Sequence, residues 1–188
     1  LVKEIAGGLG WLAWAGYPAV MKPVEAVRGR RAQLLEGASQ AEVTIRAALE
    51  RGPVMLERHV RGAREVEVPF IGDGQGGVLT LADREVTARL GSTRIWVEAP
   101  AAGLTDRCRG QMRDITLGLA KRVRWRGTGA LRFLITPDGR PYLLKVRAGL
   151  EPWHCVTERL LGVDLVDAGL RLAAGEPLRW RQSQLVPK

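Results

Sequence analysis

The chain has 188 residues, of which 46% are hydrophobic and 26% are charged. This length suits one domain or two small lobes with a real core, and the composition argues against a disordered or collagen-like chain. The net charge of +9 comes from 24 Arg against five Lys. An excess of this kind is compatible with a polyanionic or acidic partner, and an arginine-rich coding bias on solvated faces explains it as well.

The sequence gives no sign of a disulfide framework or a membrane span. Cys108 and Cys155 have no paired metal-ligand spacing, so we expect both thiols to be reduced. The uncharged run 5–21 contains several glycines and falls short of the ~20 apolar residues that a span needs. Because the chain begins with Leu1, we expect it to be part of a longer product. We expect an intracellular protein of the cytoplasm or an organelle matrix, with the compartment left open.

In chain order, the first predicted elements form a small lobe. Hydrophobic patterning predicts a helix at 3–14, strands at 18–22 and 32–35, a helix at 39–51 and a strand at 54–59. Ser39 is placed to cap the second helix, whose apolar side carries Ile45, Ala48 and Leu49. We expect this helix to cover a small sheet.

A larger lobe follows in the prediction. It begins with strands at 65–71 and 78–83, continues with a helix at 105–123 and strands at 130–135 and 141–146, and ends with a helix from Asp164 to about Gly175. Glycines at 72–77 predict a hairpin turn, and Pro137-Asp138-Gly139 predicts another. The long helix has a stripe made of Cys108, Met112, Ile115, Leu119 and Val123, which we expect to be core.

These elements predict an α+β fold with mostly antiparallel sheets flanked by helices. We place a small lobe at 1–60 and a larger lobe at 61–188, with no linker-like stretch between them.

Seven phrases, in order between residues 16 and 178, resemble the biotin carboxylase branch of the ATP-grasp family. They are Gly16-Tyr17-Pro18 followed by a strand ending in Lys22, Val54-Met55-Leu56-Glu57, Gly72-Asp73-Gly74-Gln75-Gly76, Glu98-Ala99-Pro100-Ala101, Arg126-Gly127-Thr128-Gly129-Ala130, His154-Cys155-Val156-Thr157-Glu158 leading into Gly162-Val163-Asp164-Leu165, and Ala173-Ala174-Gly175-Glu176-Pro177-Leu178. The resemblance implies an ATP-grasp fold in which ATP is held between two lobes, bicarbonate is phosphorylated and biotin is carboxylated. It also implies that the N-terminal domain and the C-terminal end of a full biotin carboxylase are absent from this chain.

The resemblance implies a partial nucleotide site. Lys22 matches the lysine that contacts ATP phosphates, and Glu57 and Val60 match the positions that enclose adenine. The alternative is a surface lysine that ends a strand, with Glu57 paired to a local arginine. The glycine run that should follow the lysine corresponds to 23–28, where Glu25 would repel phosphates and only Gly29 remains beyond the run.

The metal site implied by the resemblance is replaced by cations. Its two glutamates fall at Arg132 and Lys145, and its asparagine falls at Arg147. Since Mg²⁺ needs hard oxygen ligands, we expect no metal site and no bound cofactor. ATP and magnesium would be the cofactors if the chain were active.

The bicarbonate and biotin residues implied by the resemblance are also changed. The family lysine is Arg94, the catalytic arginine is Gly149 and the general-base glutamate is Trp153. Arginine can still hold an anion, but an indole cannot accept a proton. We therefore expect no catalytic residue in this chain. His154 keeps a family histidine and is expected to support packing, and His59 has no catalytic partner.

Our interpretation is a non-catalytic biotin-carboxylase-like domain, a structural or regulatory subunit whose partners are other proteins of a larger assembly. One alternative is an ATP-dependent biotin carboxylase subunit of an acyl-CoA or pyruvate carboxylase. Another is a module that binds RNA or another polyanion in the old phosphate cleft.

The cations themselves make a candidate site for an anion. Arg132 and Lys145 should lie on neighbouring antiparallel strands, with Arg147 on the same face and Arg94 nearby. Such a cluster needs solvent, internal acids such as Glu57 and Glu98, or an anionic group from RNA or an acidic protein segment. Internal pairing and a partner's anion are both left open.

Overall fold

The computed structural model describes residues 1–24, 32–90 and 93–187. It divides into two compact units, Leu1–Arg61 and Gly62–Lys188, and each is described by itself. All strand pairs among the described residues are antiparallel. The expected α+β fold with antiparallel sheets and flanking helices is confirmed.

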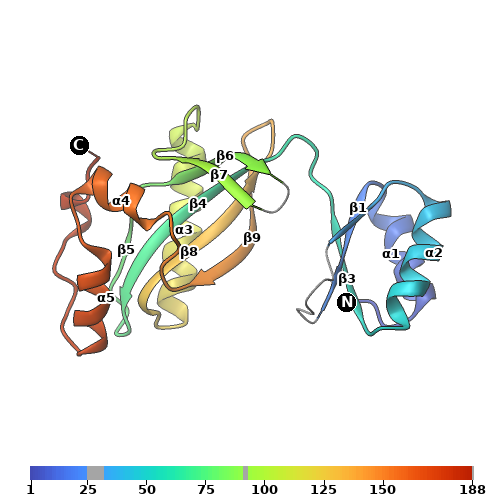
Figure 1. The fold of residues 1–188 in the computed structure, drawn as a ribbon, viewed down its shortest axis with the longest axis horizontal. Coiled ribbons are helices and arrows are strands. Elements are labelled where there is room, and N and C mark those ends of the chain that lie inside the picture. The colour runs from blue at the N-terminus through green and yellow to red at the C-terminus, as the bar shows by residue number, and fades with distance from the viewer. Residues whose placement is uncertain (25–31, 91–92, 188) are drawn as a thin grey trace. The chain divides into compact units, whose positions relative to one another are not determined.

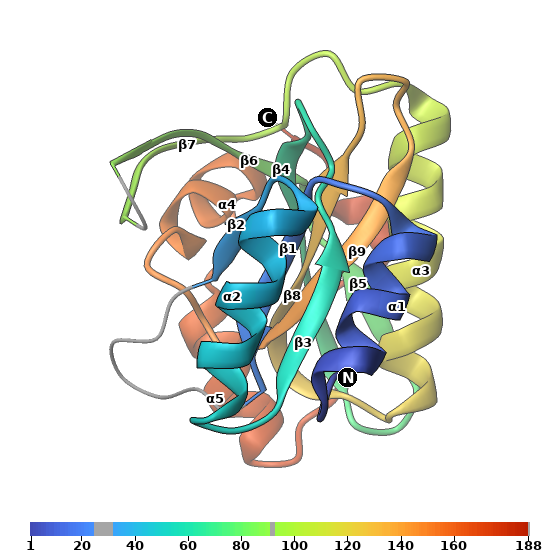
Figure 2. The same cartoon turned by 90° about the vertical axis from the view of Figure 1, so that its right-hand side faces the viewer.

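Unit 1 is a three-stranded sheet covered on one face by two helices (Figures 1 and 2). Its elements are α1 (Ile5–Ala15), β1 (Ala19–Pro23), β2 (Gln33–Leu35), α2 (Ala38–Leu49) and β3 (Val54–Arg58), with strand order β2-β1-β3. Leu12, Met21, Ile45 and other apolar side chains form its core. The cap of α2 is Gly37, not Ser39 as expected, because the helix begins two residues earlier than predicted.

Unit 2 contains a sheet with strand order β7-β6-β4-β8-β9, and the short strand β5 pairs with β4. Its strands are β4 (Arg64–Asp73), β5 (Val78–Thr80), β6 (Arg84–Leu90), β7 (Thr93–Glu98), β8 (Arg126–Ile135) and β9 (Pro141–Ala148). Strands β6 and β7 were not predicted from the sequence. Their exposed, mixed side chains lack the period-two alternation of a half-buried strand.

The turn between β4 and β5 shows why glycines are needed there. Asp73 Oδ1 accepts hydrogen bonds from the backbone N–H groups of Gln75 at 2.7 Å and Gly77 at 2.9 Å. A Cβ added at Gly77 would lie 2.2 Å from Asp73 Oδ2, so no larger residue fits without a shift. Gly74 has a φ of +80°, which side chains disfavour. The hairpin predicted at 72–77 is therefore confirmed.

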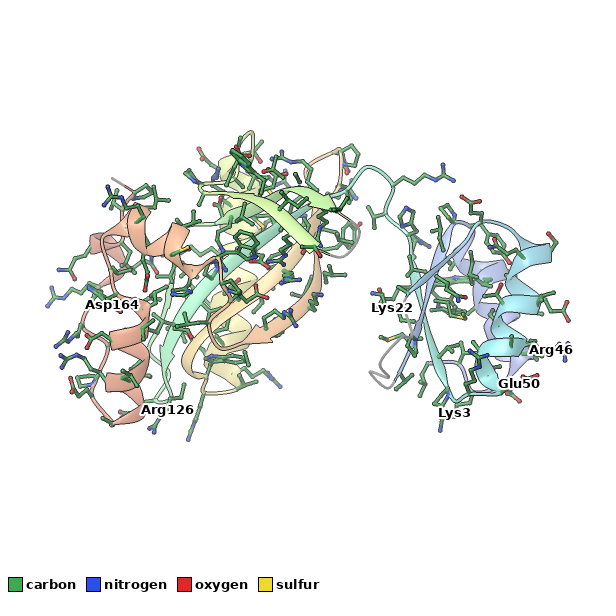
Figure 3. All side chains as sticks on the ribbon, in the orientation of Figure 1. Lys3, Lys22, Arg46, Glu50, Arg126 and Asp164 are labelled. Atoms are coloured by element: carbon green, nitrogen blue, oxygen red, sulfur yellow. The ribbon has the colours of Figure 1, made fainter. Side chains whose placement is uncertain are left out.

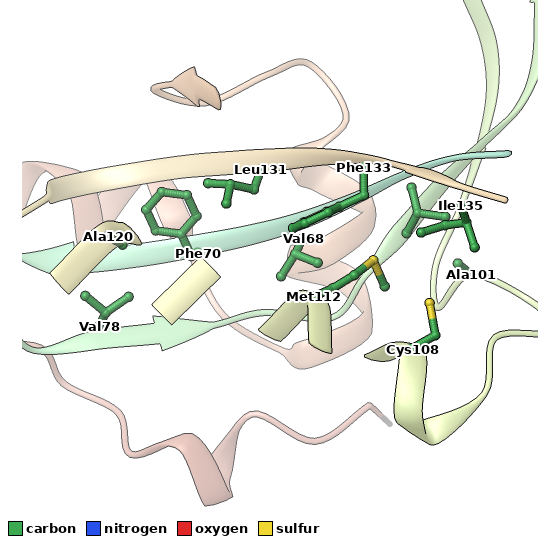
Figure 4. Close-up of a cluster of buried hydrophobic side chains, with 11 residues drawn as sticks. Val68, Phe70, Val78, Ala101, Cys108, Met112, Ala120, Leu131, Phe133 and Ile135 are labelled. Carbon is green, nitrogen blue, oxygen red and sulfur yellow. The ribbon is translucent and has the colours of Figure 1, made fainter. Parts of the chain in front are cut away.

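Helix α3 (Asp106–Arg122) covers one face of the unit 2 sheet and forms its main core (Figures 1 and 4). Its N-cap Thr105 accepts a hydrogen bond from the backbone of Cys108 at 3.2 Å. The predicted apolar stripe is only half right. The buried side of the helix carries Cys108, Met112, Thr116 and Ala120, whereas Ile115, Leu119 and Val123 are 36, 37 and 63% exposed. The small side chains at 116 and 120 let the helix approach the sheet closely.

The C-terminal part of unit 2 packs on the β4–β5 hairpin. It consists of α4 (His154–Leu161), α5 (Leu165–Ala173) and a short 3-10 helix, η1 (Gln182–Gln184). Ile71, Leu79, Leu161, Leu165 and Leu172 share a second apolar cluster there. The Asp164 side chain caps α5 by accepting from Asp167 N at 2.7 Å, as predicted. No helix among the described residues is long and apolar enough to cross a membrane.

Candidate functional site

In unit 1, two residues of the expected nucleotide site pair with each other. Met21 turns into the core, so alternation along β1 turns Lys22 to the other face of the sheet (Figure 3). Lys22 Nζ donates to Glu57 Oε2 on neighbouring β3, and the two side chains are 30 and 34% exposed. The prediction that Glu57 pairs with a local arginine is therefore wrong, because its partner is Lys22.

The rest of that expected site is only partly described. Val60 follows β3 and is half-buried, with no polar contact to the Lys22–Glu57 pair. The predictions for Glu25 and Gly29 lie outside the described residues. Binding of a nucleotide by Lys22, Glu57 and Val60 therefore stays a prediction.

In unit 2, charged side chains gather on the sheet face opposite α3. In the strand register, Glu67 on β4 lies opposite Arg132 on β8, and Arg132 lies opposite Lys145 on β9. Arg147 shares their face because it follows Lys145 by two residues. The structure therefore brings together Arg132, Lys145 and Arg147 as expected. We call the whole group the ionic cluster; its members are Glu65, Glu67, Glu151, Arg84, Arg89, Arg94, Arg132, Lys145 and Arg147.

Glu67 is the centre of the ionic cluster and is fully buried. Arg84 Nη2 donates to its Oε2 at 3.1 Å, and Arg94 Nη2 donates to its Oε1. Arg132 Nε lies within ion-pair reach of the same carboxylate but lacks hydrogen-bond geometry. A buried carboxylate is tolerated only when cations and hydrogen bonds replace its lost water, and these three arginines supply those partners to Glu67.

Glu151, in the loop before α4, is the second shared carboxylate. Its Oε1 accepts from Arg132 Nη2 at 2.6 Å and from Arg147 Nε at 3.0 Å, and its Oε2 accepts from Arg94 Nη1 at 3.3 Å. Burial acts to raise the pKa of Glu151, but these hydrogen bonds and charges outweigh it and lower that pKa to about 2. Glu151 is therefore an anion at any physiological pH.

Glu65 completes the acidic side of the cluster. Arg89 Nη2 lies 2.6 Å from its Oε2, and Arg94 Nη2 lies 3.1 Å from its Oε1. Burial lowers the pKa of Arg94, but its bond to Glu67 and the nearby carboxylates outweigh this and raise it overall. The arginine expected to hold an outside anion is thus occupied by internal carboxylates.

Lys145 differs from the arginines around it. No described residue forms a hydrogen bond or ion pair with its ammonium group. Its pKa is lowered by burial first and then by the charges of Arg132 and Arg147, with Glu65 acting weakly in the opposite direction. The charged form of Lys145 is therefore disfavoured where it lies.

Internal pairing of the cations was one of two outcomes left open by the sequence, and its detail was partly wrong. Glu57 does pair with a cation, Lys22, but Glu98 instead accepts a 2.5 Å hydrogen bond from Thr87. Sequence reasoning missed Glu65, Glu67 and Arg84. The available signal was the spacing Glu65-x-Glu67 within an apolar strand, which puts two acids on one sheet face.

The residues present do not fit a magnesium ion. Among the described residues, no three His, Cys, Asp or Glu side chains are grouped so as to hold a metal. The positions where the resemblance implies metal-binding glutamates carry Arg132 and Lys145, and the nearby acids Glu67 and Glu151 already accept from arginines. An additional dication would be repelled by these guanidinium and ammonium groups.

The other two altered positions lie beside the ionic cluster. Gly149 follows β9 with a φ of +83° and has no side chain to offer. Trp153 precedes α4 and, with Lys145 and Arg147, lines a pocket of the cluster. His154 Nδ1 lies 2.8 Å from the backbone oxygen of Glu151, a contact that supports this loop.

Comparison with known proteins gives a family match over most of the chain. The family model described as "Carbamoyl-phosphate synthase L chain, ATP binding domain" matches residues 3–181. The biotin carboxylase of Pseudomonas aeruginosa is 30% identical over 178 residues, which cover 91% of this chain and 39% of the relative. That of Allochromatium vinosum is 29% identical over 177 residues, with 90% and 39% covered. The chain thus spans about two fifths of the length of these relatives.

Solved structures agree on the fold. The biotin carboxylase domain of the Hydrogenobacter thermophilus 2-oxoglutarate carboxylase, in complex with MgADP, ADP and bicarbonate, matches with a TM-score of 0.89 at 24% identity, over 100% of this chain and 43% of that one. The biotin carboxylase domain of a single-chain bacterial carboxylase matches with a TM-score of 0.77 at 30% identity, covering 98% and 41%.

The two α+β units are thus those of an ATP-grasp protein. The chain belongs to the family of carbamoyl-phosphate synthase L chain ATP-binding domains, in its biotin carboxylase branch.

Proposed function

We propose that this chain is a non-catalytic biotin-carboxylase-like domain that acts as a structural or regulatory part of a larger assembly. The observation that carries the proposal is the inverted charge at Arg132 and Lys145, beside acids that arginines already occupy. Phosphoryl transfer depends on positioning and on metal ions that neutralise the phosphates. A site that repels the metal has lost the largest electrostatic contribution to that reaction.

The carboxylation step lacks residues as well. Biotin carboxylation by the route that the resemblance implies needs a base, and Trp153 offers only an N–H donor. It also needs a cation at position 149, where glycine has no side chain. Arg94 supplies charge, but that charge is engaged by Glu65, Glu67 and Glu151.

The main alternative is an active ATP-dependent biotin carboxylase with bound ATP and magnesium. It is favoured by the names of the relatives, which are biotin carboxylases, and by the retained Lys22, Glu57 and Val60. In that case residues outside this chain would have to supply the metal ligands and the base. A module for RNA or another polyanion is a third proposal, supported by the net charge of +9.

Phosphate release from ATP decides between the first two proposals. The protein would be assayed with bicarbonate, biotin and magnesium, beside its Lys22→Ala variant. We expect no release above buffer in either protein. Turnover in the unchanged protein that Lys22→Ala abolishes would overturn the non-catalytic proposal.

Magnesium-dependent nucleotide binding provides a second measurement. Because a ligand stabilises only the state that binds it, ATP with magnesium should leave the melting temperature of the chain unchanged. The double variant Arg132→Glu/Lys145→Glu should behave in the same way, since it restores acids without restoring the glycine run. A magnesium-dependent shift in the unchanged chain would support the active alternative.

A further inference from the structure

The ionic cluster holds more positive than negative charge. Three carboxylates, Glu65, Glu67 and Glu151, face five arginines and Lys145. Each arginine reaches at least one carboxylate, whereas Lys145 reaches none among the described residues. Folding therefore leaves the ammonium group of Lys145, an exposed residue, beside other cations and without a counter-charge, although a neutral side chain in its place would remove the repulsion from its neighbours.

This ammonium group lines an accessible pocket. The walls come from Arg89 and Thr93 on the β6–β7 hairpin, Lys145 and Arg147 on β9, and Trp153 before α4. Arg94 and Arg132 form its inner side, where their side chains are 7 and 6% exposed and turn to the internal acids. Arg147 is 49% exposed and uses Nε for Glu151, so no described residue contacts its two terminal nitrogens. Donors without a recorded partner among the described residues thus face the pocket from Lys145 and Arg147, and also from Arg89, of which only Nη2 pairs with Glu65.

The surroundings of the pocket indicate what kind of molecule brings the anion. The β6–β7 hairpin exposes Leu90, Ile95 and Trp96, which are 74, 54 and 59% accessible. Leu90 pairs with Thr93, a pocket residue, so one side chain of this apolar group lies next to the pocket, and Ile95 and Trp96 follow Arg94, another pocket residue, along β7. Protein interfaces combine aromatic and aliphatic side chains with arginine in this way.

RNA is a poorer match to the same surface. It binds along tracks of spaced cations, with bases stacked on aromatic rings. Here the cations converge on one pocket, and Leu90 and Ile95 cannot stack on bases.

We propose that Lys145 and Arg147 bind a carboxylate of an acidic, hydrophobic protein segment whose apolar side chains pack on the β6–β7 hairpin. The proposal rests on the proposed non-catalytic function and adds the class of ligand that the pocket lined by Lys145 and Arg147 binds. Its test measures peptide binding, so a failure of this proposal can be distinguished from a failure of the non-catalytic function, which ATP turnover tests.

The test uses a library of random displayed peptides, selected against the full chain and counter-selected against its Lys145→Gln variant. We expect enriched peptides with Asp or Glu next to large apolar residues. The best peptide, labelled with fluorescein, is then titrated by anisotropy at two salt concentrations. Lys145→Gln and Trp96→Ala should each weaken binding about tenfold.

Matched controls make the result decisive. Lys121→Gln removes the same charge from the last turn of α3 and should leave affinity unchanged. A melting temperature of Lys145→Gln that is no lower than that of the unchanged chain shows that its fold is intact. The proposal is overturned if the enriched peptides lack acids, if Lys145→Gln binds as well as the unchanged chain, or if Lys121→Gln is equally impaired. Tighter binding of a poly-U oligonucleotide that is lost in Lys145→Gln would assign the pocket to RNA instead.

Discussion

The two faces of the unit 2 sheet carry different kinds of side chain, apolar on one and charged on the other. Toward α3, strands β4 and β8 present Val66, Val68, Phe70, Leu131 and Phe133, all of them buried (Figure 4). On the other face the same two strands present Glu65, Glu67 and Arg132. Apolar packing on one face thus stabilises the fold, whereas the other face carries acidic and basic side chains that neutralise one another.

This difference shows why the chemistry of such a cleft can change while the fold persists. Apolar burial contributes about 25 cal/mol per Å² and does not depend on which charges lie behind the sheet. A buried ionic group contributes little net stability and mainly requires that each charge have a partner. Arg132 and Lys145 are tolerated because their exchange altered only the second face.

The largest expected effect breaks the apolar face. Phe133→Ala removes a fully buried ring between β8 and α3, and it should lower the free energy of unfolding of unit 2 by about 4 kcal/mol. Urea unfolding followed by Trp125 fluorescence checks this, since Trp125 packs on Phe70 in the same core with ring centroids 5.1 Å apart. Phe133→Leu is the conservative control. If Phe133→Ala lowered the free energy of unfolding by less than Glu67→Gln does, the apolar face would not be the more important one for stability.

The next effect breaks the ionic face at its centre. Glu67→Gln removes one negative charge from between Arg84, Arg94 and Arg132 while keeping the side-chain shape. Three clustered cations then lose a shared partner, so we expect a loss of about 3 kcal/mol. The exposed pair Glu42–Arg46 gives a matched control, for which Glu42→Gln should cost about 0.4 kcal/mol. Equal effects at both sites would mean that burial does not matter here.

Acid should weaken the ionic face selectively. The pKa of Glu151 lies at about 2 in the folded chain against an ordinary 4.5. Its stabilising contribution is therefore complete above the unfolded value and is lost as pH falls toward the folded one. We expect a loss of about 1–2 kcal/mol, with allowance for solvent screening. Unfolding free energies across this pH range should fall less steeply in Glu151→Gln; parallel slopes would contradict the assignment.

The smallest effect has the opposite sign. Lys145 has a lowered pKa, so its charged form destabilises the folded chain below that pKa, and the penalty fades as pH rises through it. Lys145→Gln should therefore raise the free energy of unfolding slightly near neutral pH, by less than about 0.5 kcal/mol because solvent screens the charge of this exposed residue. The gain should shrink in alkaline solution, whereas Lys121→Gln should give none. A loss of stability would show that Lys145 has an internal partner.

Much of this architecture could be predicted from the sequence because its signals are local. Period-two alternation located β4, β8 and β9, the glycines at 72–77 located a hairpin, and Asp164 located the start of α5. The shared face of Arg132, Lys145 and Arg147 could also be predicted, since the turn at 137–139 sets how β8 and β9 pair.

The remainder depends on contacts between distant segments. Strands β6 and β7 are exposed at one end of the sheet, so their side chains carry no clear burial period. The buried side of α3 is set by how closely Thr116 and Ala120 let it approach the sheet, which hydrophobicity alone does not predict. Glu65 and Glu67 were missed as partners of Arg94 and Arg132 because they are far from these arginines along the chain.

The position of β9 has a consequence for solubility. Within the described residues β9 ends the sheet, and Tyr142, Leu143 and Val146 on it are 51, 43 and 46% exposed. A sheet edge with exposed apolar residues invites pairing with the edge of another copy, and charged side chains on the strand oppose such pairing. Lys145 and Arg147 therefore also oppose aggregation through this edge, so Lys145→Gln, which removes the charge that has no internal partner, would gain folding stability and lose colloidal stability.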